Sequence, residues 1–343
     1  MGSFLPFALP TGAGTWRTRP ARLRLLGSGR QALRELVSFG QRELGWASLH
    51  LPSYYCPGVA AALDDLLPVH TYPAGPEDGV VPQVDAPSGA VVAVSYFGAP
   101  PVSPTGSRAA LIVDTTHDPV APWLSGTSAD YAFASLRKTL PLPDGGALWA
   151  APSCPLPPQR TPGEGHLATV ATMLSAMCLK AAYLDGAPVP KERYLALAAS
   201  AEQALESRVV SGMSDYSAAA LDALPVDQLR QHRTANAIAL QRLIAGVPDV
   251  IARAYPFGVV LVFDTVERRE RVRRGLIAEQ VYPAVLWAGA VDGTTPVGSG
   301  FADRMLFLHT DFRYAEPDLA RVAVIVRRLC LANVAPDQRG TPC

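Results

Sequence analysis

Short apolar runs that alternate with helical segments constrain this 343-residue chain more than any other feature. Residues 90–96, 109–114, 130–135 and 145–150 have the length and composition of buried strands. Residues 29–44 place apolar side chains at helical spacing instead. Buried strands that alternate with helices are typical of a mainly parallel sheet with helices on both faces. The sequence therefore predicts an α/β fold.

The pattern changes in the last third of the chain, where the order of elements is that of a compact α+β lobe. Since 343 residues exceed the size at which single hydrophobic cores stop growing, two domains are expected. We predict an irregular arm over residues 1–20, a large domain over 21–245 and a small C-terminal domain over 246–343. Other expected elements are helices at 57–66, 166–184, 190–208, 217–245 (broken near Pro225), 266–279 and 316–332, and strands at 47–52, 67–72, 258–264, 281–286 and 304–309.

Composition limits the partners that the chain can have. Hydrophobic residues make up 49% of the chain and charged residues only 17%, so much of the protein is interior or meets another subunit. The formal net charge is zero and no basic stripe occurs, which argues against nucleic acid. No apolar run suggests a membrane span or a secretory signal, and the five scattered cysteines lack metal-site spacing. We therefore expect a cytoplasmic protein with no metal site.

A carboxylate stands at the end of one predicted strand, in the stretch Val113-Asp114-Thr115-Thr116-His117. Ligands of open α/β sheets bind at the carboxyl ends of the strands, and a buried carboxylate there needs a cationic partner. The protonated nitrogen of a pyridine ring would be such a partner, and His117 could reach the same ligand. A role for Asp114 as an ordinary helix N-cap explains the residue equally well.

The next predicted strand ends in Ser135-Leu136-Arg137-Lys138. A lysine at a strand end beside a buried pocket can have its pKa lowered and then form an imine, and Ser135 could donate its hydroxyl to a phosphate. Because the chain has only three lysines, one in an apolar stretch stands out. Ser-x-x-Lys also occurs in serine β-lactamases, but their Ser-Asp-Asn and Lys-Thr-Gly motifs are missing here. A surface lysine on a loop is the remaining alternative.

Two glycines flank a serine just before the first predicted helix, in Leu26-Gly27-Ser28-Gly29-Arg30. Backbone N–H groups at a helix N-terminus bind phosphate, and glycines allow the close approach that this needs. Taken alone, the stretch is explained by an ordinary glycine turn. Together, the three stretches give a phosphate-binding turn, then an aspartate, then a lysine.

In this order the stretches resemble the fold-type-I pyridoxal-phosphate (PLP) aminotransferases of the DegT/DnrJ/StrS type, which often act on nucleotide-linked keto sugars. The resemblance covers about residues 22–150 well and the rest of the chain weakly. The motifs that carry it are the small-residue phosphate turn, the Asp-x-x-Gln/His pair, and the phosphate serine and Schiff-base lysine with their closing glycines. The matching positions are Gly27-Ser28-Gly29-Arg30 with Ala32-Leu33, Asp114-x-x-His117, and Ser135-x-x-Lys138 followed by Gly145-Gly146.

The resemblance implies a mainly parallel, seven-stranded sheet, a bound PLP and a homodimer. By this resemblance Asp114 would keep the pyridine nitrogen protonated, and His117 would contact the ring hydroxyl. Lys138 would hold the cofactor as a Schiff base and later move protons as a free amine. The other implied cofactor-binding residues contact the phosphate or the ring face, and are Ser28, Gly29, Arg30, Ser135 and either Tyr54 or Tyr55.

Several later positions have two explanations each. Tyr54 and Tyr55 stand where the family stacks a side chain on the cofactor ring, but both could be core residues. Arg313 could bind a substrate carboxylate with two hydrogen bonds or form a structural salt bridge. The family's Asn-Tyr-Arg stretch, which reaches the phosphate of the neighbouring subunit, has its nearest counterpart in residues 214–217. Those residues read Ser-Asp-Tyr-Ser, so that contact is lost or rebuilt here.

We predict a PLP-dependent aminotransferase that acts on a small keto or amino metabolite, sugars included, in a biosynthetic pathway. The same lysine and aspartate would serve a PLP-dependent lyase, cyclase or decarboxylase, because the substrate bond held perpendicular to the ring decides which bond breaks. A non-catalytic relative that acts as a binding or regulatory module is a third hypothesis. The intact lysine argues against it.

Overall fold

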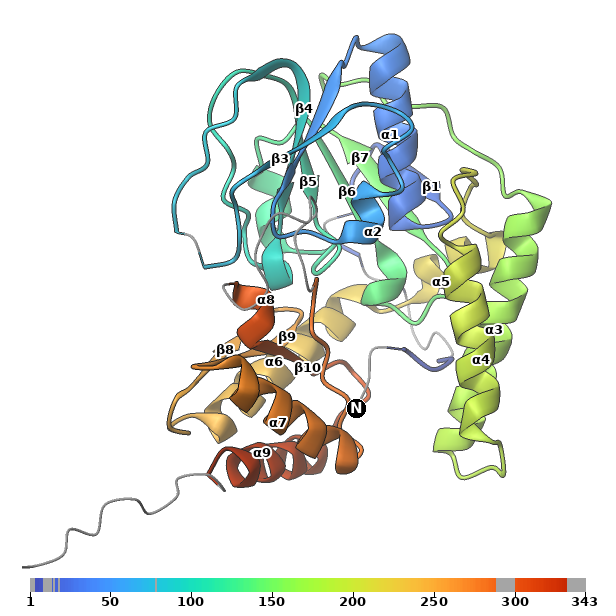
Figure 1. The fold of residues 1–343 in the computed structure, drawn as a ribbon. Coiled ribbons are helices and arrows are strands. Elements are labelled where there is room, and N and C mark those ends of the chain that lie inside the picture. Colours follow the sequence, from blue (N-terminus) through green and yellow to red (C-terminus); the bar gives the residue numbers. More distant parts are fainter. Residues whose placement is uncertain are drawn as a thin grey trace, which may run out of the picture. The chain divides into compact units, whose positions relative to one another are not determined.

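The computed structural model describes residues 4–8, 14, 16–17, 19–77, 79–287 and 300–331 (Figure 1). Its described part forms two compact units, one up to Gln231 and the other from His232 onward. The division falls inside a helix, whereas the sequence predicts a domain boundary near Gly246. Each unit has a sheet of its own.

The larger unit contains a seven-stranded sheet in the order β1-β7-β6-β5-β4-β2-β3. Among the described strands of this sheet, β7 alone runs against the others, pairing antiparallel with both β6 and β1. The carboxyl ends of β1 to β6 therefore meet at one edge, where β7 begins. This confirms the predicted fold class. The strands are β1 (Leu23–Leu26), β2 (Ser48–Pro52), β3 (Val69–Tyr72), β4 (Ala86–Val94), β5 (Arg108–Asp114), β6 (Tyr131–Ser135) and β7 (Gly146–Ala150).

The central strands form because their sequences suit burial on both faces. Residues 90–94 of β4 and 110–114 of β5 are all buried, and almost all are valine, alanine, leucine or isoleucine. A strand covered on both sides gains from an unbroken apolar run rather than an alternating one. The same apolar runs therefore fix where β5 and β6 end, and with that the positions of Asp114 and Ser135.

Helix α1 (Gly29–Glu43) follows β1 directly and confirms the helix predicted at 29–44. Ser28 is its N-cap, and the Ser28 hydroxyl accepts a hydrogen bond from the backbone N–H of Gln31 at 3.3 Å. The apolar face of α1 packs on β6 and β7, with Leu33 and Leu36 fully buried. This packing fixes the first turn of α1 at the edge where the strands end.

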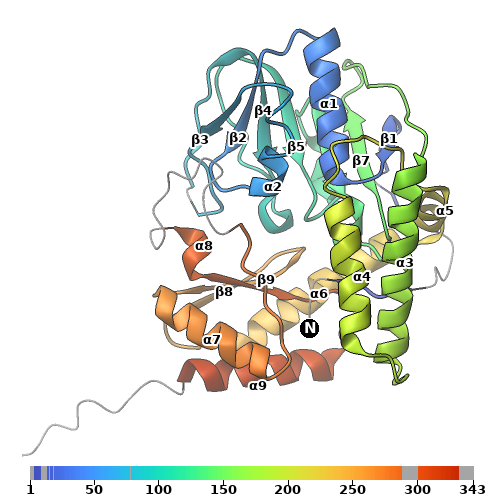
Figure 2. The same cartoon turned by 45° about the vertical axis from the view of Figure 1, so that its right-hand side comes forward.

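The longer helices that follow the sheet in the larger unit are α3 (Glu164–Leu184), α4 (Lys191–Ala204) and α5 (Asp215–Ala223). Helices α3 and α4 lie side by side in both views (Figures 1 and 2). The sequence suggested no membrane span, but α3 is long and apolar enough to cross a membrane by length and composition alone. Only 22% of its most apolar stretch is buried. The arm residues Phe4 and Phe7 pack against a small core cluster of these helices.

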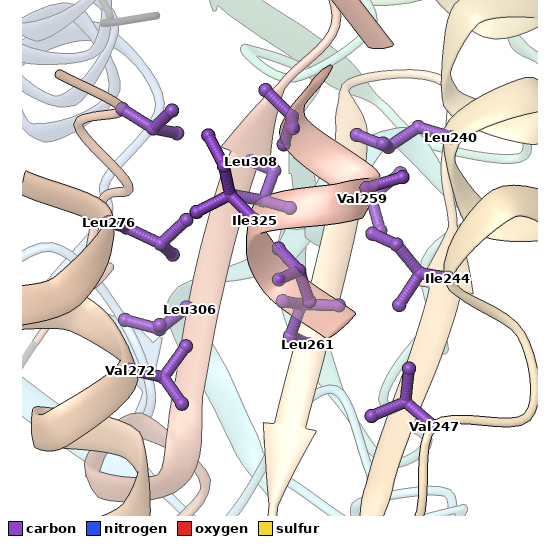
Figure 3. Packing of buried hydrophobic residues seen from close by; sticks show 14 of the residues in the cluster. Leu240, Ile244, Val247, Val259, Leu261, Val272, Leu276, Leu306, Leu308 and Ile325 are labelled. Carbon is purple, nitrogen blue, oxygen red and sulfur yellow. The ribbon is translucent and has the colours of Figure 1, made fainter. Parts of the chain in front are cut away.

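The smaller unit is built on a three-stranded antiparallel sheet in the order β10-β9-β8. Its strands are β8 (Val250–Ala254), β9 (Gly258–Phe263) and β10 (Met305–His309), and its helices are the later part of α6 (Val226–Ile244), α7 (Val266–Ala278), α8 (Phe301–Arg304) and α9 (Glu316–Leu331). Aliphatic side chains of α6, α7 and α9 meet those of β9 and β10 in one core cluster (Figure 3).

Two predicted elements are wrong. Helix α2 (Pro57–Ala60) is much shorter than the helix expected at 57–66, because turns with i→i+3 hydrogen bonds replace it up to Leu66. No strand forms over 281–286: within the described residues, only Ala284 bridges to Phe307 of β10. The left-handed backbone of Gln280 and of Trp287, with φ of 60° and 55°, bounds the segment, and Pro283 cannot donate to a ladder. Strands β1 and β8 were not predicted.

Candidate active site

The three predicted stretches meet at the edge of the seven-stranded sheet where six strands end. Asp114 is the last residue of β5 and Ser135 the last of β6, and the backbone N–H of Ser135 donates to Thr116 Oγ1 at 3.0 Å. A Cβ placed on Gly29 would stand 2.8 Å from the Cβ of Ser135. The first turn of α1 therefore approaches the end of β6 so closely that only glycine fits at position 29.

Asp114 is buried, and each of its carboxylate oxygens is held by a different element. The Tyr55 hydroxyl donates to Oδ2 at 2.6 Å, and the backbone N–H of Thr116 donates to Oδ1 at 2.8 Å. Burial raises the pKa of Asp114 above its ordinary value, and hydrogen bonds from Tyr55 and from both the side chain and the backbone of Thr116 oppose that rise. A carboxylate has about four acceptor positions, so it can accept a further donor such as a pyridinium N–H. No described helix begins at Asp114, which leaves the N-cap alternative without support.

His117 is buried at the same edge and has a fixed ring orientation. Its Nδ1 accepts a hydrogen bond from the backbone N–H of Phe97 at 3.0 Å, so in the neutral ring the proton is on Nε2. The Phe97 ring stacks on the imidazole with centroids 5.9 Å apart and planes 8° apart. The backbone of Phe97 is left-handed, with φ of 54°, which is unfavourable for a bulky residue and often marks functional sites.

Lys138 ends the short 3-10 turn that follows β6. Repulsion from the neighbouring Arg137, together with partial loss of water, lowers the pKa of Lys138 to about 8 although its side chain is exposed, and the nearby Glu202 opposes this shift. Arg137 is itself held by a two-fold ion pair with Glu202 of α4, whose Nη2–Oε2 distance is 2.6 Å. A lowered pKa increases the uncharged amine available at neutral pH, which is the form that attacks a carbonyl.

The predicted phosphate-binding turn is supported by a buried polar cluster that could not be recognised from the sequence. Asp144 accepts hydrogen bonds from His166 Nε2 at 2.9 Å, from the N–H and hydroxyl of Ser214 at 2.8 and 2.7 Å, and from the Ser217 hydroxyl. Burial would raise the pKa of Asp144, but these hydrogen bonds outweigh it and lower the pKa. Ser214 and Ser217 start α5, so the segment that resembles the family's Asn-Tyr-Arg stretch binds Asp144.

This cluster reaches the turn through Gly27. The Gly27 carbonyl accepts from the N–H of Gly145 at 2.9 Å, and the Gly27 N–H donates to Ser211 at 2.9 Å. A Cβ on Gly27 would stand 2.4 Å from the His166 ring, and one on Gly146 would stand 2.1 Å from the Ser28 carbonyl oxygen. Gly27 and Gly146, the second glycine of the pair that resembles the family's closing glycines, thus leave room for the turn. Nothing in the local sequence signals that His166, on α3, packs here.

The remaining predicted cofactor residues have contacts of their own. Arg30 pairs with Glu206 at 3.0 Å on the first turn of α1. Tyr55 is fully buried and bonded to Asp114, so its contacts fit a core tyrosine better than a stacking face. Tyr54 is half-buried, and its ring lies 5.6 Å from that of Tyr96.

Arg313 lies in the smaller unit, where its guanidinium is engaged by Asp311. Nε and Nη2 of Arg313 donate to the two oxygens of Asp311, both at 2.6 Å. Asp311 is buried, and Asn236 donates to the backbone carbonyls of Asp311 and Tyr314, which holds the segment between these two residues in place. This geometry is the one expected of a structural salt bridge.

No protein-family model and no curated sequence matches this chain. Solved structures do match. The aminotransferase TlmJ from Streptoalloteichus hindustanus is 16% identical with a TM-score of 0.58, covering 92% of this chain and 87% of that one. This chain has the aminotransferase fold of type I.

Two further solved aminotransferase structures match to the same degree. The sugar aminotransferase CalS13 from Micromonospora echinospora is 15% identical with a TM-score of 0.55, covering 89% of this chain and 87% of that one. A proposed sugar aminotransferase from Streptococcus pneumoniae, solved in its PLP form, is 12% identical with a TM-score of 0.56. It covers 94% of this chain and 92% of the other. At these identities the likeness establishes the aminotransferase fold of this chain.

Proposed function

We propose that the protein is a PLP-dependent aminotransferase that acts on a small keto or amino metabolite, keto sugars included, in a biosynthetic pathway. One observation carries the proposal. A buried carboxylate, a lysine of lowered pKa and a glycine-lined helix N-terminus stand at one edge of a sheet, at Asp114, Lys138 and Ser28-Gly29. The similar solved structures include sugar aminotransferases and a PLP form, which supports the same conclusion.

The residues present fit PLP. The first turn of α1 offers backbone N–H groups, and its close approach to Ser135, which a Cβ on Gly29 would prevent, brings them beside the Ser135 hydroxyl; phosphate binds well at such a terminus. Ser28, Gly29 and Ser135 would bind the phosphate, with Arg30 adding positive charge. When bound, the cofactor supplies a ring that withdraws electrons from the substrate carbon.

The side chains around the ring would divide the proton chemistry between them. Asp114 would hold a proton at the pyridine nitrogen, and His117 would donate from Nε2 to the ring hydroxyl. Lys138 would bind the cofactor aldehyde and, once released, move a proton as a free amine. Its lowered pKa suits both tasks, because each needs the uncharged form near neutral pH.

We further propose a cytoplasmic homodimer. The exposed apolar surface of α3 supports a dimer. Only 22% of the most apolar stretch of this helix is buried, and a second subunit could bury the rest. Arg313 remains the predicted residue for a substrate carboxylate. A substrate would have to compete there with Asp311.

An amino-donor screen separates transamination from the other PLP reactions. The protein loaded with PLP is mixed with glutamate, other amino acids or an amino sugar, and the visible band of the bound cofactor is followed. Transamination predicts loss of that band and release of the matching keto product in equal amount. A band that persists with every donor, while an amino acid loses carbon dioxide or a leaving group, would favour the lyase or decarboxylase alternative.

A further inference from the structure

Tyr55 lies in the candidate site but has no role in the chemistry proposed above. Its side chain is fully buried, and its hydroxyl donates to Asp114 Oδ2 at 2.6 Å. The residue comes from the segment after β2, whereas Asp114 ends β5, so the contact joins elements that are separated in the chain and in the sheet. An O–H···O⁻ bond of this length between buried groups is typical of strong, charge-assisted hydrogen bonds.

The contact fixes the carboxylate from two sides. Tyr55 holds Oδ2, and the backbone N–H of Thr116 holds Oδ1 at 2.8 Å. Any rotation of the carboxylate would break one bond or both. Its remaining acceptor directions are therefore set before a ligand arrives.

The contact also weakens Asp114 as a base. A hydrogen bond donated to a carboxylate stabilises its charged form, while burial of Asp114 favours the neutral acid. A proton shared between Asp114 and a pyridine nitrogen goes to the stronger base. Each donor to the carboxylate therefore favours the proton on the nitrogen, which is the state in which the ring withdraws electrons.

We propose that Tyr55 is a positioning residue that acts through Asp114, holding the carboxylate in place and keeping the shared proton on the ring nitrogen of PLP. The inference rests on the proposed function, because it needs PLP at this site. It assigns Tyr55 a role other than stacking on the ring.

The test measures the proton directly, by the ¹⁵N chemical shift of the ring nitrogen in protein loaded with ¹⁵N-labelled PLP. This shift separates pyridine from pyridinium and follows the proton continuously between the two bases. For Tyr55→Phe we expect the ¹⁵N shift to move toward the value of pyridine. We also expect kcat to fall about tenfold, which corresponds to a one-unit change in the pKa difference between Asp114 and the ring nitrogen, with KM little changed. The matched control is Tyr72→Phe, since the Tyr72 hydroxyl is also buried and donates at 2.6 Å, but to the Val92 carbonyl. We expect it to keep the wild-type shift.

A second change acts in the opposite direction and keeps the tyrosine ring. Difluorotyrosine incorporated at position 55 is a stronger donor, so we expect the ¹⁵N shift to move further toward pyridinium. It also answers the question if Tyr55→Phe does not fold. A shift unchanged in both proteins, or changed equally by Tyr72→Phe, would overturn the inference. Borohydride trapping of PLP on wild-type Lys138 is done first: no adduct there contradicts the proposed function, whereas an adduct with an unmoved shift contradicts only the role of Tyr55.

Discussion

The two sheets of this protein differ in what stands at the ends of their strands. In the larger unit, strands that run parallel bring Asp114, Ser135 and the turn before α1 to one edge from distant parts of the chain. In the smaller unit, the antiparallel strands and the helices pack around a mainly aliphatic core (Figure 3). Of the polar residues after β10, Asp311 and Arg313 bind each other. The parallel strands thus bring together side chains that can act on a ligand. In the antiparallel sheet of the smaller unit, the polar residues at the end of a strand instead form a structural salt bridge.

The largest expected effect tests the larger unit alone. Lys138→Ala removes the amine that would hold the cofactor and move the proton, so we expect the glutamate half-reaction to slow by about 10³-fold or more. Because the side chain is exposed, the urea unfolding midpoint should hardly change. Lys191→Ala, at the start of α4, is the matched control and should retain full activity. A Lys138→Ala protein that still transaminates would place the chemistry elsewhere.

The next effect tests the smaller unit. Phe263 is buried in the core of β9, so Phe263→Ala should lower the free energy of unfolding by about 3–5 kcal/mol, measured by urea denaturation. The folded protein should still bind PLP with wild-type affinity, because that cluster contains none of the predicted cofactor residues. Phe133→Ala, at a buried position of β6, should cost a similar amount and weaken PLP binding as well. Equal loss of PLP affinity in both variants would contradict the claim that the sheet of the larger unit, and not that of the smaller unit, supports PLP binding.

A smaller effect is expected behind the phosphate turn. His166→Leu removes the donor to Asp144 and the ring that packs on Gly27, so we expect PLP to bind about tenfold more weakly, within the range of one lost hydrogen bond. Pyridoxal, which lacks the phosphate, should bind both proteins equally. His166→Gln restores a donor and should recover most of the loss. His50→Leu, which removes a histidine bonded to Ser48 on β2, should change neither affinity.

The smallest effect concerns pH. Since only uncharged Lys138 reacts with the cofactor aldehyde and its pKa is about 8, the rate of PLP attachment should rise with pH and level off above about 8. Arg137→Gln removes the main cause of the lowered pKa and leaves Glu202, which raises it. The rise should therefore move to higher pH, slowing attachment several-fold at neutral pH, as stopped-flow absorbance would show. A profile identical to that of the wild type would contradict the role given to Arg137.

Much of the larger unit could be predicted because its central strands are apolar runs with clear ends. These ends gave Asp114 and Ser135 their correct places, and Ser28 its place at the start of α1. Strand β1 was missed because it has only four residues, Leu-Arg-Leu-Leu, which is too short a run to give a clear apolar pattern.

The contacts that complete the site could not be predicted. Tyr55 meets Asp114 across 59 positions of sequence, and His166 meets Asp144 across 22, and no local pattern signals either pair. Such contacts depend on how helices and strands pack, which apolar periodicity alone does not encode. In the smaller unit, backbone turns at Gln280 and Trp287 similarly override the apolar run at 281–286.

The most direct test of the central claim is borohydride reduction of the purified protein with PLP, followed by peptide mapping. We expect a visible absorption band that borohydride abolishes, and a single phosphopyridoxyl adduct on Lys138. A protein that shows no band and forms no adduct, or forms it equally on Lys180 and Lys191, would show that Lys138 does not hold PLP.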